Sequence, residues 1–577
     1  MKFDKNLFKR KMKTQSIKGL AFVLAAGTVV SSCTLLKDLE YNVTPDPLEM
    51  HGDSVKVRVD VTFPEKGIKK KASAEITPML GSTALKPVTF QGEKATGNGN
   101  VIAYKPGGKY TYTDVVAYTP EMEVTELKIT GTVSKAGKVK DQIDPIKIAD
   151  GTIITPLWVN KDFKVILAND QFKRVNEKNA TAQLNYAKGK SNVVPAELKD
   201  ADIVAFQNWL AAAQSNPKIK IKSMKIVGFA SPEGEEDKNN TLSSDRAGTG
   251  KTTVMDLSKK AKNEAGQTEM YSLTGSGEDY PGFKKALEAD TKMNADDKNL
   301  VLRVLDMYSN PVEREQAMRD MGKTFTYLDK NIFPGLRRSE ITAVYDLTGF
   351  SDEELKANSV SNPDTLNLEE LLFTATLYTD LNEKLRVYKI AEARYADDYR
   401  PANNVGAVLY MQNKVSEAKA KFEKANGIKD NAISKNNLAA VAGVEGNRSK
   451  AMGLLNQASG AGSEVNYNKG ILNIQSGDYS SAVSNLGSEA SFNKALAQLL
   501  NGNPSAAVST IDGSVDKESA QGYYLKAVAA ARQDKLNDVV SNLKSAIAKD
   551  GALKAKAMKD REFLKYAENA AFTAIVK

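Results

Sequence analysis

Residues 224–247 read MKIVGFASPEGEEDKNNTLSSDRA, and this stretch decides the fold of the central part of the chain. Apolar residues at Met224, Ile226 and Phe229 predict a short buried strand, and the Pro and Gly behind them enforce a turn. A loop should follow, with a helix opening at Leu242. Several polar side chains would then lie close together where the loop after the strand leads into the helix. The N-terminus of a helix attracts anionic groups.

The same stretch resembles the OmpA-like peptidoglycan-binding domain, whose signature is G-[HY]-T-D-x-x-G followed by N-x-x-L-S-x-x-R-A. The matching positions are Gly228, Gly234, Asn239, Leu242, Ser243, Arg246 and Ala247. The resemblance implies that Arg246 would hold the carboxylate of the diaminopimelate in the wall peptide, while the family's Asp would hold its amine. Ser231 occupies that Asp position here, so half of the clamp is missing.

Glu233 could restore the lost contact if the turn at Pro232 swings its carboxylate inward. A glutamate in an acidic run is more often solvent-facing, and that is our expectation here. Losing one contact to a charged group lowers affinity about ten- to hundredfold. We therefore expect weak or absent wall-peptide binding, with Arg246, Ser231, Glu233 and Asn239 as the candidate binding residues.

The resemblance covers residues 181–348 and is similar to the variants of the family that carry an ASPEG sequence. Strands and helices alternate here, which predicts an α/β layer. This domain should begin with the strand AQLNYA (182–187) and end with the strand ITAVYDL (341–347), which follows a helical insertion over 290–339. Between them, an amphipathic helix over 197–214 is expected to carry Ala201, Ala205, Trp209 and Ala212 along its apolar face, with Phe206 and Leu210 alongside.

One segment imitates a nucleotide-binding motif. DRAGTGKTT (245–253) is similar to the phosphate-binding loop G-x-x-x-x-G-K-[ST], but Asp245 stands at the first Gly position. An Asp facing phosphates would repel them, and the OmpA-like register places these residues inside a helix. Nucleotide binding is therefore not expected.

The N-terminus predicts export and lipidation. Residues 1–32 carry a basic segment and the apolar run GLAFVLAAGTVV, and VSSC ends at Cys33, which is the pattern of a signal peptide with a lipobox. The resemblance to bacterial lipoproteins implies cleavage before Cys33 and acylation of its thiol; an uncleaved signal anchor with an incidental Cys is the alternative. We expect an outer-membrane lipid anchor, with the periplasmic face favoured over the cell surface.

Composition excludes several classes of site. The leader holds seven Lys or Arg residues and one Asp, so removing it takes six of the nine net positive charges and leaves +3, which gives no reason to expect nucleic acid. Cys33 is the single cysteine and His51 the single histidine. A disulfide within the chain, a histidine-based metal site, a Ser-His triad and a Cys-His pair are all impossible. We expect no catalytic residue, no metal and no cofactor.

Residues 33–145 predict an antiparallel β-sandwich. SVKVRVDVTF (54–63) alternates apolar and polar residues throughout, and further short strands follow between Gly-, Asn- and Pro-rich turns. The tyrosines of this region could form a sugar-stacking face, but core and cross-strand packing is the favoured interpretation; they are Tyr104, Tyr110, Tyr112 and Tyr118. Residues 146–180 are a connecting segment.

Residues 349–365 form a linker with a brief helix capped by Ser351 and Glu354, and everything from 366 to 577 reads as helical repeats. Small or apolar residues recur at steps of 33, 33, 31, 25 and 32, at Leu385, Ala418, Ala451, Ala482, Ala507 and Val539. This spacing resembles tetratricopeptide repeats, with the step of 25 marking a shortened unit. About six helix pairs and a cap would stack into a solenoid whose concave side binds a protein or, alternatively, only spaces the molecule.

Two classes of function compete. The favoured one is an outer-membrane-anchored, non-enzymatic scaffold of the cell envelope, with the OmpA-like domain facing the wall or a partner and an unidentified protein bound to the repeats. The alternatives are an adhesin-assembly component or a glycan or cell-wall hydrolase. A hydrolase needs paired carboxylates across a cleft, for which the candidates are Glu233, Glu235, Glu236 and Asp237.

Overall fold

The computed structural model describes residues 27–29, 36 and 39–577. These residues form two compact units, one ending at Asn169 and completed by Lys384–Lys577, the other comprising Asp170–Glu383. Most of the predicted leader, and Cys33, the predicted lipidation site, lie outside the described residues. None of the helices in the described part is long and apolar enough to cross a membrane.

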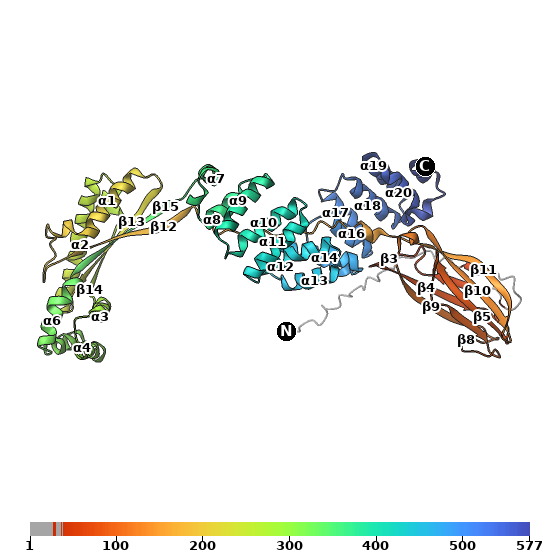
Figure 1. The fold of residues 1–577 in the computed structure, drawn as a ribbon, viewed down its shortest axis with the longest axis horizontal. Helices are drawn as coiled ribbons and strands as arrows, with labels where there is room; N and C mark the ends of the chain where they lie inside the picture. The colour runs from red at the N-terminus through yellow and green to blue at the C-terminus, as the bar shows by residue number, and fades with distance from the viewer. Residues whose placement is uncertain (1–26, 30–35, 37–38) are drawn as a thin grey trace, which may run out of the picture. The chain divides into compact units, whose positions relative to one another are not determined.

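The first unit begins with two facing sheets, which is the predicted sandwich (Figure 1). One sheet holds β1 (Gly27–Val29), β2 (Leu39–Val43), β3 (Met50–His51), β4 (Ser54–Phe63) and β9 (Gly108–Ala117). The other holds β5 (Ala72–Leu80), β6 (Thr83–Ala84), β7 (Val88–Gly92), β8 (Asn100–Ile102), β10 (Thr125–Lys135) and β11 (Lys138–Gly151). The two cores between the sheets are continuous through shared side chains such as Val61 and Ile129.

Strand β4 has the predicted residues and the predicted inward face, with Val55, Val57, Val59 and Phe63 buried. Packing also explains two of the tyrosines. The ring of Tyr110 meets Phe90 edge-on at 5.1 Å between centroids. Tyr112 is buried and donates its hydroxyl to the carbonyl of Lys86.

The repeats occupy Lys384–Lys577, a region that the structure describes completely. Successive antiparallel helix pairs are α10 (Tyr399–Met411) with α11 (Val415–Ile428), α12 (Ala432–Val444) with α13 (Arg448–Gln457), α14 (Ser463–Ser476) with α15 (Tyr479–Asn485), α16 (Phe492–Leu500) with α17 (Pro504–Asp512), and α18 (Ala520–Ala531) with α19 (Leu536–Lys549). Helix α9 (Leu381–Arg394) precedes them, and α20 (Ala552–Lys559) and α21 (Ala570–Val576) close the array.

Five of the six repeat positions read from the sequence lie in the second helix of a pair, Leu385 lies in α9 ahead of the first pair, and all six are buried. The predicted shortened unit is also present: α15 has seven residues, and α16 and α17 have nine each. Because each pair buries apolar side chains against the next pair, the helices from α12 onward share one long core cluster. The C-terminal region is thus an all-helical array that resembles a tetratricopeptide solenoid.

The second unit contains a four-stranded sheet in the order β12–β15–β13–β14. Its strands are β12 (Val175–Asn185), β13 (Ile219–Ala230), β14 (Tyr271–Glu278) and β15 (Arg338–Thr348), and only β13 and β14 run parallel. Helices α1 (Ala201–Ser215) and α2 (Glu236–Lys260) share a core with this sheet. The α/β layer is therefore present.

The helical insertion has its own apolar core, and β15 follows it as predicted. Its helices are α3 (Tyr280–Ala289), α4 (Ala295–Met307), α5 (Pro311–Arg319) and α6 (Lys323–Asn331). Farther on come α7 (Asp352–Ser361) and α8 (Leu368–Thr376). The capping box expected at Ser351 and Glu354 is formed at the start of α7.

Two expectations for this unit are wrong. Helix α2 begins at Glu236 rather than at Leu242, so Ser243 and Arg246 lie well inside the helix and not at its N-terminus. On α1 the buried face consists of Ile203, Phe206, Leu210 and Ala213, whereas the predicted stripe of Ala201, Ala205 and Ala212 is exposed and Trp209 is half-buried. The larger side chains decide which face packs, because burying them removes more apolar area from water.

Candidate functional site

An extended segment lies against the repeats, and we name its residues 158–169 the strap. The first helices of four successive pairs each present one asparagine to the backbone of the strap. We name these residues the asparagine ladder: Asn404 on α10, Asn437 on α12, Asn468 on α14 and Asn493 on α16. All four side chains are buried.

Each ladder amide binds one strap residue through both of that residue's backbone polar groups. Asn437 accepts from the N–H of Ile166 at 2.7 Å and donates to the carbonyl of Ile166 at 2.8 Å. The other three ladder residues form the same pair of hydrogen bonds at 2.7–2.9 Å: Asn404 with Ala168, Asn468 with Lys164, and Asn493 with Asn160. A carboxamide has one donor and one acceptor side, so it matches a peptide group edge-on.

The pairing follows the geometry of an extended chain. Successive residues of such a chain face opposite ways, so residues two apart point the same backbone groups at the ladder. Each step to the next pair therefore moves the contact back by two strap residues: α10 binds Ala168, α12 binds Ile166 and α14 binds Lys164. The next step, to α16, moves the contact by four residues, from Lys164 to Asn160. Asp162 lies between them, and its side chain accepts a hydrogen bond from the hydroxyl of Tyr467 at 2.9 Å.

A second layer of asparagines supports the first. Asn436 and Asn403, each one residue before a ladder position, donate to the carbonyls of Lys164 and Ile166 at 3.1 and 3.0 Å. Further bonds join neighbouring repeats, for example from Nδ2 of Asn437 to Oδ1 of Asn403 at 3.0 Å. Buried amides are costly unless they are paired, and here the network pairs them from repeat to repeat.

Apolar side chains of the strap, including the buried Val159, also pack against the repeats, and two rings anchor it through specific contacts. The ring of Phe163 is buried against Gly443 on α12, where a Cβ would lie only 2.5 Å from the ring. Trp158 meets the ring of Tyr524 nearly edge-on at 4.9 Å, and the ammonium of Lys556 lies 4.1 Å from the Trp158 ring centroid. The side chains of Lys161 and Lys164 are exposed. The asparagine ladder binds alternate strap residues, Lys164 among them, through their backbone groups.

The sandwich also contacts the repeats directly. His51 on β3 lies 3.0 Å from the hydroxyl of Tyr479, and Arg448 forms an ion pair with Asp53. The guanidinium of Arg561 donates to the carbonyl of Gly151, the last residue of β11. His51, the single histidine of the chain, therefore takes part in a contact between the sandwich and the repeats.

The residues singled out from the OmpA-like signature meet in the second unit. Ser231, Glu233, Asn239 and Arg246 line one cleft of about 590 Å³ beside the N-terminal half of α2. Asn239 donates to the carboxylate of Glu278 at 2.6 Å. The structure therefore brings these four residues together in one cleft, although the sequence places the start of the helix incorrectly.

Arg246 is already committed to the protein. Its side chain is buried and donates to the carbonyls of Phe229 at 2.7 Å and Lys190 at 3.0 Å, and it approaches that of Ala187 at 3.5 Å. Burial lowers the pKa of Arg246 to about 10. The guanidinium still carries its charge at neutral pH, but two or three of its five donors are used internally.

Glu233 faces inward, contrary to the expectation of a solvated glutamate. Its carboxylate accepts from Arg337 at 2.9 and 3.0 Å and from the hydroxyl of Ser231 at 2.8 Å. The side chains of Glu233 and Arg337 are only 7% and 8% exposed. A two-pronged guanidinium contact of this kind holds the loop rigidly. The carboxylate of Glu233 therefore lies next to Ser231, the position of the family's Asp, but it is paired with the guanidinium of Arg337.

Sequence reasoning missed Arg337 and the whole asparagine ladder. Arg337 lies in the segment FPGLRRSE, at the end of the predicted helical insertion. The ladder positions are 33, 31 and 25 residues apart, and the consecutive steps between Ala418, Ala451, Ala482 and Ala507 have these same values. Buried asparagines that recur with the period of the helices are thus a readable signal. No cluster of His, Cys, Asp and Glu in the described part of the chain could hold a metal ion.

No family model and no curated protein sequence matches this chain. Solved structures with similarity include the tetratricopeptide repeat protein YrrB, described as having an unusual peptide-binding site, at 21% identity over 29% of this chain and 97% of that chain, with a TM-score of 0.26. A tetratricopeptide repeat protein from Parabacteroides merdae ATCC 43184 matches at 16% identity over 38% of this chain and 91% of that chain, with a TM-score of 0.27. The assignment of the repeats stands on the helix pairing and the buried repeat positions.

Proposed function

We propose that this protein is a non-enzymatic scaffold of the cell envelope whose repeats bind an extended peptide segment. The observation that carries the proposal is the asparagine ladder, which binds both backbone groups of alternate strap residues. A surface that binds backbone rather than side chains accepts any extended segment with apolar residues at the anchor positions. In this chain the bound segment is its own strap, which also leads directly from the sandwich.

The scaffold role gives each region a task. Acylation at Cys33 would hold the protein in the outer membrane, because several acyl chains anchor far more firmly than one. The strap and the contacts at His51, Asp53 and Gly151 fasten the sandwich to the repeats. The remaining surface of the solenoid is then free for a protein partner, as in other repeat arrays.

For the OmpA-like cleft we propose at most weak contact with the wall peptide. The geometry supports this because Arg246 donates to backbone carbonyls and Glu233 pairs with Arg337, so a muropeptide would have to compete with existing partners. Calorimetry with a diaminopimelate-containing muropeptide would test it. Micromolar binding that Arg246→Ala and Glu233→Ala both abolish would contradict the proposal.

A hydrolase is the less favoured alternative. Of its candidate carboxylates, Glu233 accepts two bonds from Arg337, while Glu235, Glu236 and Asp237 lie at the exposed start of α2. Release of soluble products from wall or glycan preparations by the purified protein would overturn the non-enzymatic proposal.

The peptide-binding role can be tested with the strap supplied in trans. Residues 158–169 are replaced by a Gly/Ser stretch of equal length in the full chain, and a synthetic peptide of the strap sequence is titrated calorimetrically. We expect saturable one-to-one binding that is lost when Asn437 and Asn468 are both changed to Ala. No binding to a folded strap-replaced protein would refute the role.

A further inference from the structure

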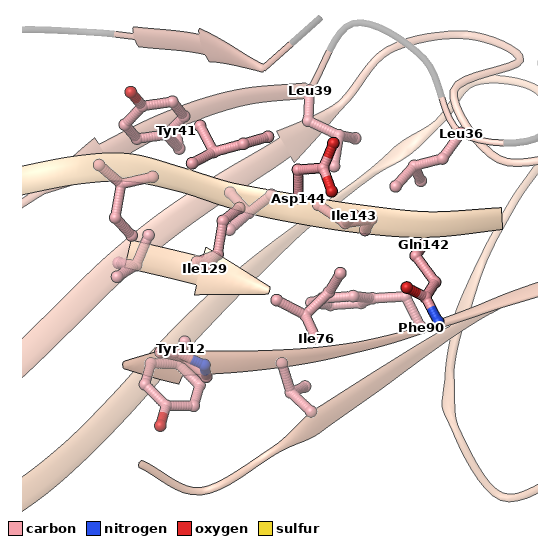
Figure 2. A pocket seen from close by; sticks show the side chains of 16 residues that line it. Leu36, Leu39, Tyr41, Ile76, Phe90, Tyr112, Ile129, Gln142, Ile143 and Asp144 are labelled. Atoms are coloured by element: carbon pink, nitrogen blue, oxygen red, sulfur yellow. The ribbon is translucent and has the colours of Figure 1, made fainter. Parts of the chain in front are cut away.

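The β-sandwich contains an apolar hollow that none of the functions discussed so far uses. It has a volume of about 290 Å³ and lies between the two sheets, where Figure 2 shows side chains from both sheets facing one space. Its wall includes Leu39, Val61, Ile76, Phe90, Ile129 and Ile146. Native interiors are packed nearly as densely as organic crystals, so a hollow of this size in a small sandwich calls for an occupant.

Local geometry explains why the sheets do not close. The pairing of β10 with β11 shifts register at three places, including Ile129/Gly131 and Val133/Ser134. Such irregularities bend a strand away from the flat ladder. Consequently Val61 and Ile129 are only partly buried although they point into the sandwich, and the alternation of β4 weakens at Val61.

The shape and chemistry of the hollow select the ligand. Its wall takes in Gln142 to Ile148 on β11 but only three-residue spans of β4, β5 and β7, and it encloses about 290 Å³. A flexible alkyl chain can adapt to an irregular apolar space of this volume more readily than a rigid ring system can. An engineered apolar cavity of about 150 Å³ already binds benzene, so the volume is sufficient for a ligand.

Polar groups lie at one part of the wall only. Gln142 and Asp144 on β11 line the hollow and are exposed, and both are labelled in Figure 2. The hydroxyl of Tyr112, by contrast, already donates to Lys86 and Asp114. No Lys or Arg is among the described residues that line the hollow. A carboxylate head would therefore meet the carboxylate of Asp144, whereas a cationic or uncharged head would not.

We propose that this hollow binds a single alkyl chain of an amphiphile whose head group is cationic or uncharged and lies beside Asp144. The chain replaces the missing apolar contacts between the sheets. The occupant is either a separate amphiphile or, if the lipidation proposed above holds, an acyl chain carried by this protein itself.

Calorimetric titration of the full chain carrying Cys33→Ser tests the proposal, since this variant has no acyl chain of its own. Dodecylamine, below its micelle concentration and at pH 7, should bind one-to-one and at least tenfold more tightly than dodecanoate. Ile129→Trp and Val61→Phe should each weaken dodecylamine binding at least tenfold by filling the hollow, without lowering the thermal midpoint. Val115→Trp, at a 60% exposed position on β9, is the matched control and should bind as the parent does.

Asp144→Lys should reverse the preference toward dodecanoate, whereas Asp141→Lys, at a position outside the wall of the hollow, should not. Absence of saturable binding, or binding that both filling variants leave unchanged, would overturn the proposal. The source is decided with the Cys33 protein purified from envelopes. Loss of dodecylamine binding there identifies its own acyl chain as the occupant, and unchanged binding identifies a separate amphiphile. If Cys33 is not acylated, the Cys33 protein and the Cys33→Ser variant should bind dodecylamine equally, and the other measurements still decide whether the hollow binds an alkyl chain.

Discussion

Replacing Asn437 by Ala removes one rung of the ladder and should open the strap locally. The N–H of Ile166 loses its acceptor at 2.7 Å, while the carbonyl of Ile166 keeps the donor supplied by Asn403 at 3.0 Å. The cost is therefore mainly that of one buried, unsatisfied donor, about 1–3 kcal/mol. Taking about 2 kcal/mol, the equilibrium constant for opening rises roughly thirtyfold.

Hydrogen exchange at the amide of Ile166 measures this opening directly. Its protection factor should fall roughly thirtyfold in the variant, with a smaller change at Lys164, which Asn468 binds. Asn456→Ala, on the exposed face of α13, is the matched control and should stay within about 0.5 kcal/mol of the parent. If the Ile166 amide exchanges at the parent rate in Asn437→Ala, or if the control changes it equally, the ladder does not hold the strap.

Three further predictions concern other contacts. Gly443→Ala places a Cβ about 2.5 Å from the Phe163 ring and should expose the strap to limited proteolysis, whereas Gly453→Ala on α13, with open space around it, should be neutral or slightly stabilising. Burial and the neighbouring Glu278 raise the pKa of Glu315 from 4.5 to about 7, so its contribution to stability is present below pH 4.5 and is lost as the pH rises to 7; Glu315→Gln should remove about 1 kcal/mol of this dependence, allowing for solvent screening, in urea unfolding at pH 5 and 7. Cys33→Ser should release the protein from outer-membrane fractions, and unchanged fractionation of a processed variant would exclude lipidation as the anchor.

Periodicity predicted most of the fold. The alternation of residues 54–63 gives β4 correctly, and the steps between Ala418 and Val539 mark the second helix of each pair. Both signals arise because the buried face repeats with the period of the secondary structure. The stripe on α1 shows the limit, since Ala205 fits the helical period as well as Phe206 does and only packing decides between them.

The sites depend on contacts between residues far apart in the sequence. Glu233 looks like a solvated acid until Arg337, more than one hundred residues later, is found beside it. The strap reads as a plain connection because its recognition uses backbone groups, which leave no trace in its own sequence. The trace lies instead in the repeats, where buried asparagines recur with the helix pairs.

The central claim is that the repeats recognise peptide backbone, and N-methylation of the strap peptide tests it most directly. Methylation at Ile166 removes the N–H that Asn437 accepts, while methylation at Val165 alters a group that faces the other way in an extended chain. Calorimetry on the strap-replaced protein should show at least tenfold weaker binding for the peptide methylated at Ile166, and binding close to that of the unmodified peptide for the one methylated at Val165. Equal affinities for the unmodified peptide and the Ile166-methylated peptide would contradict backbone recognition by the asparagine ladder.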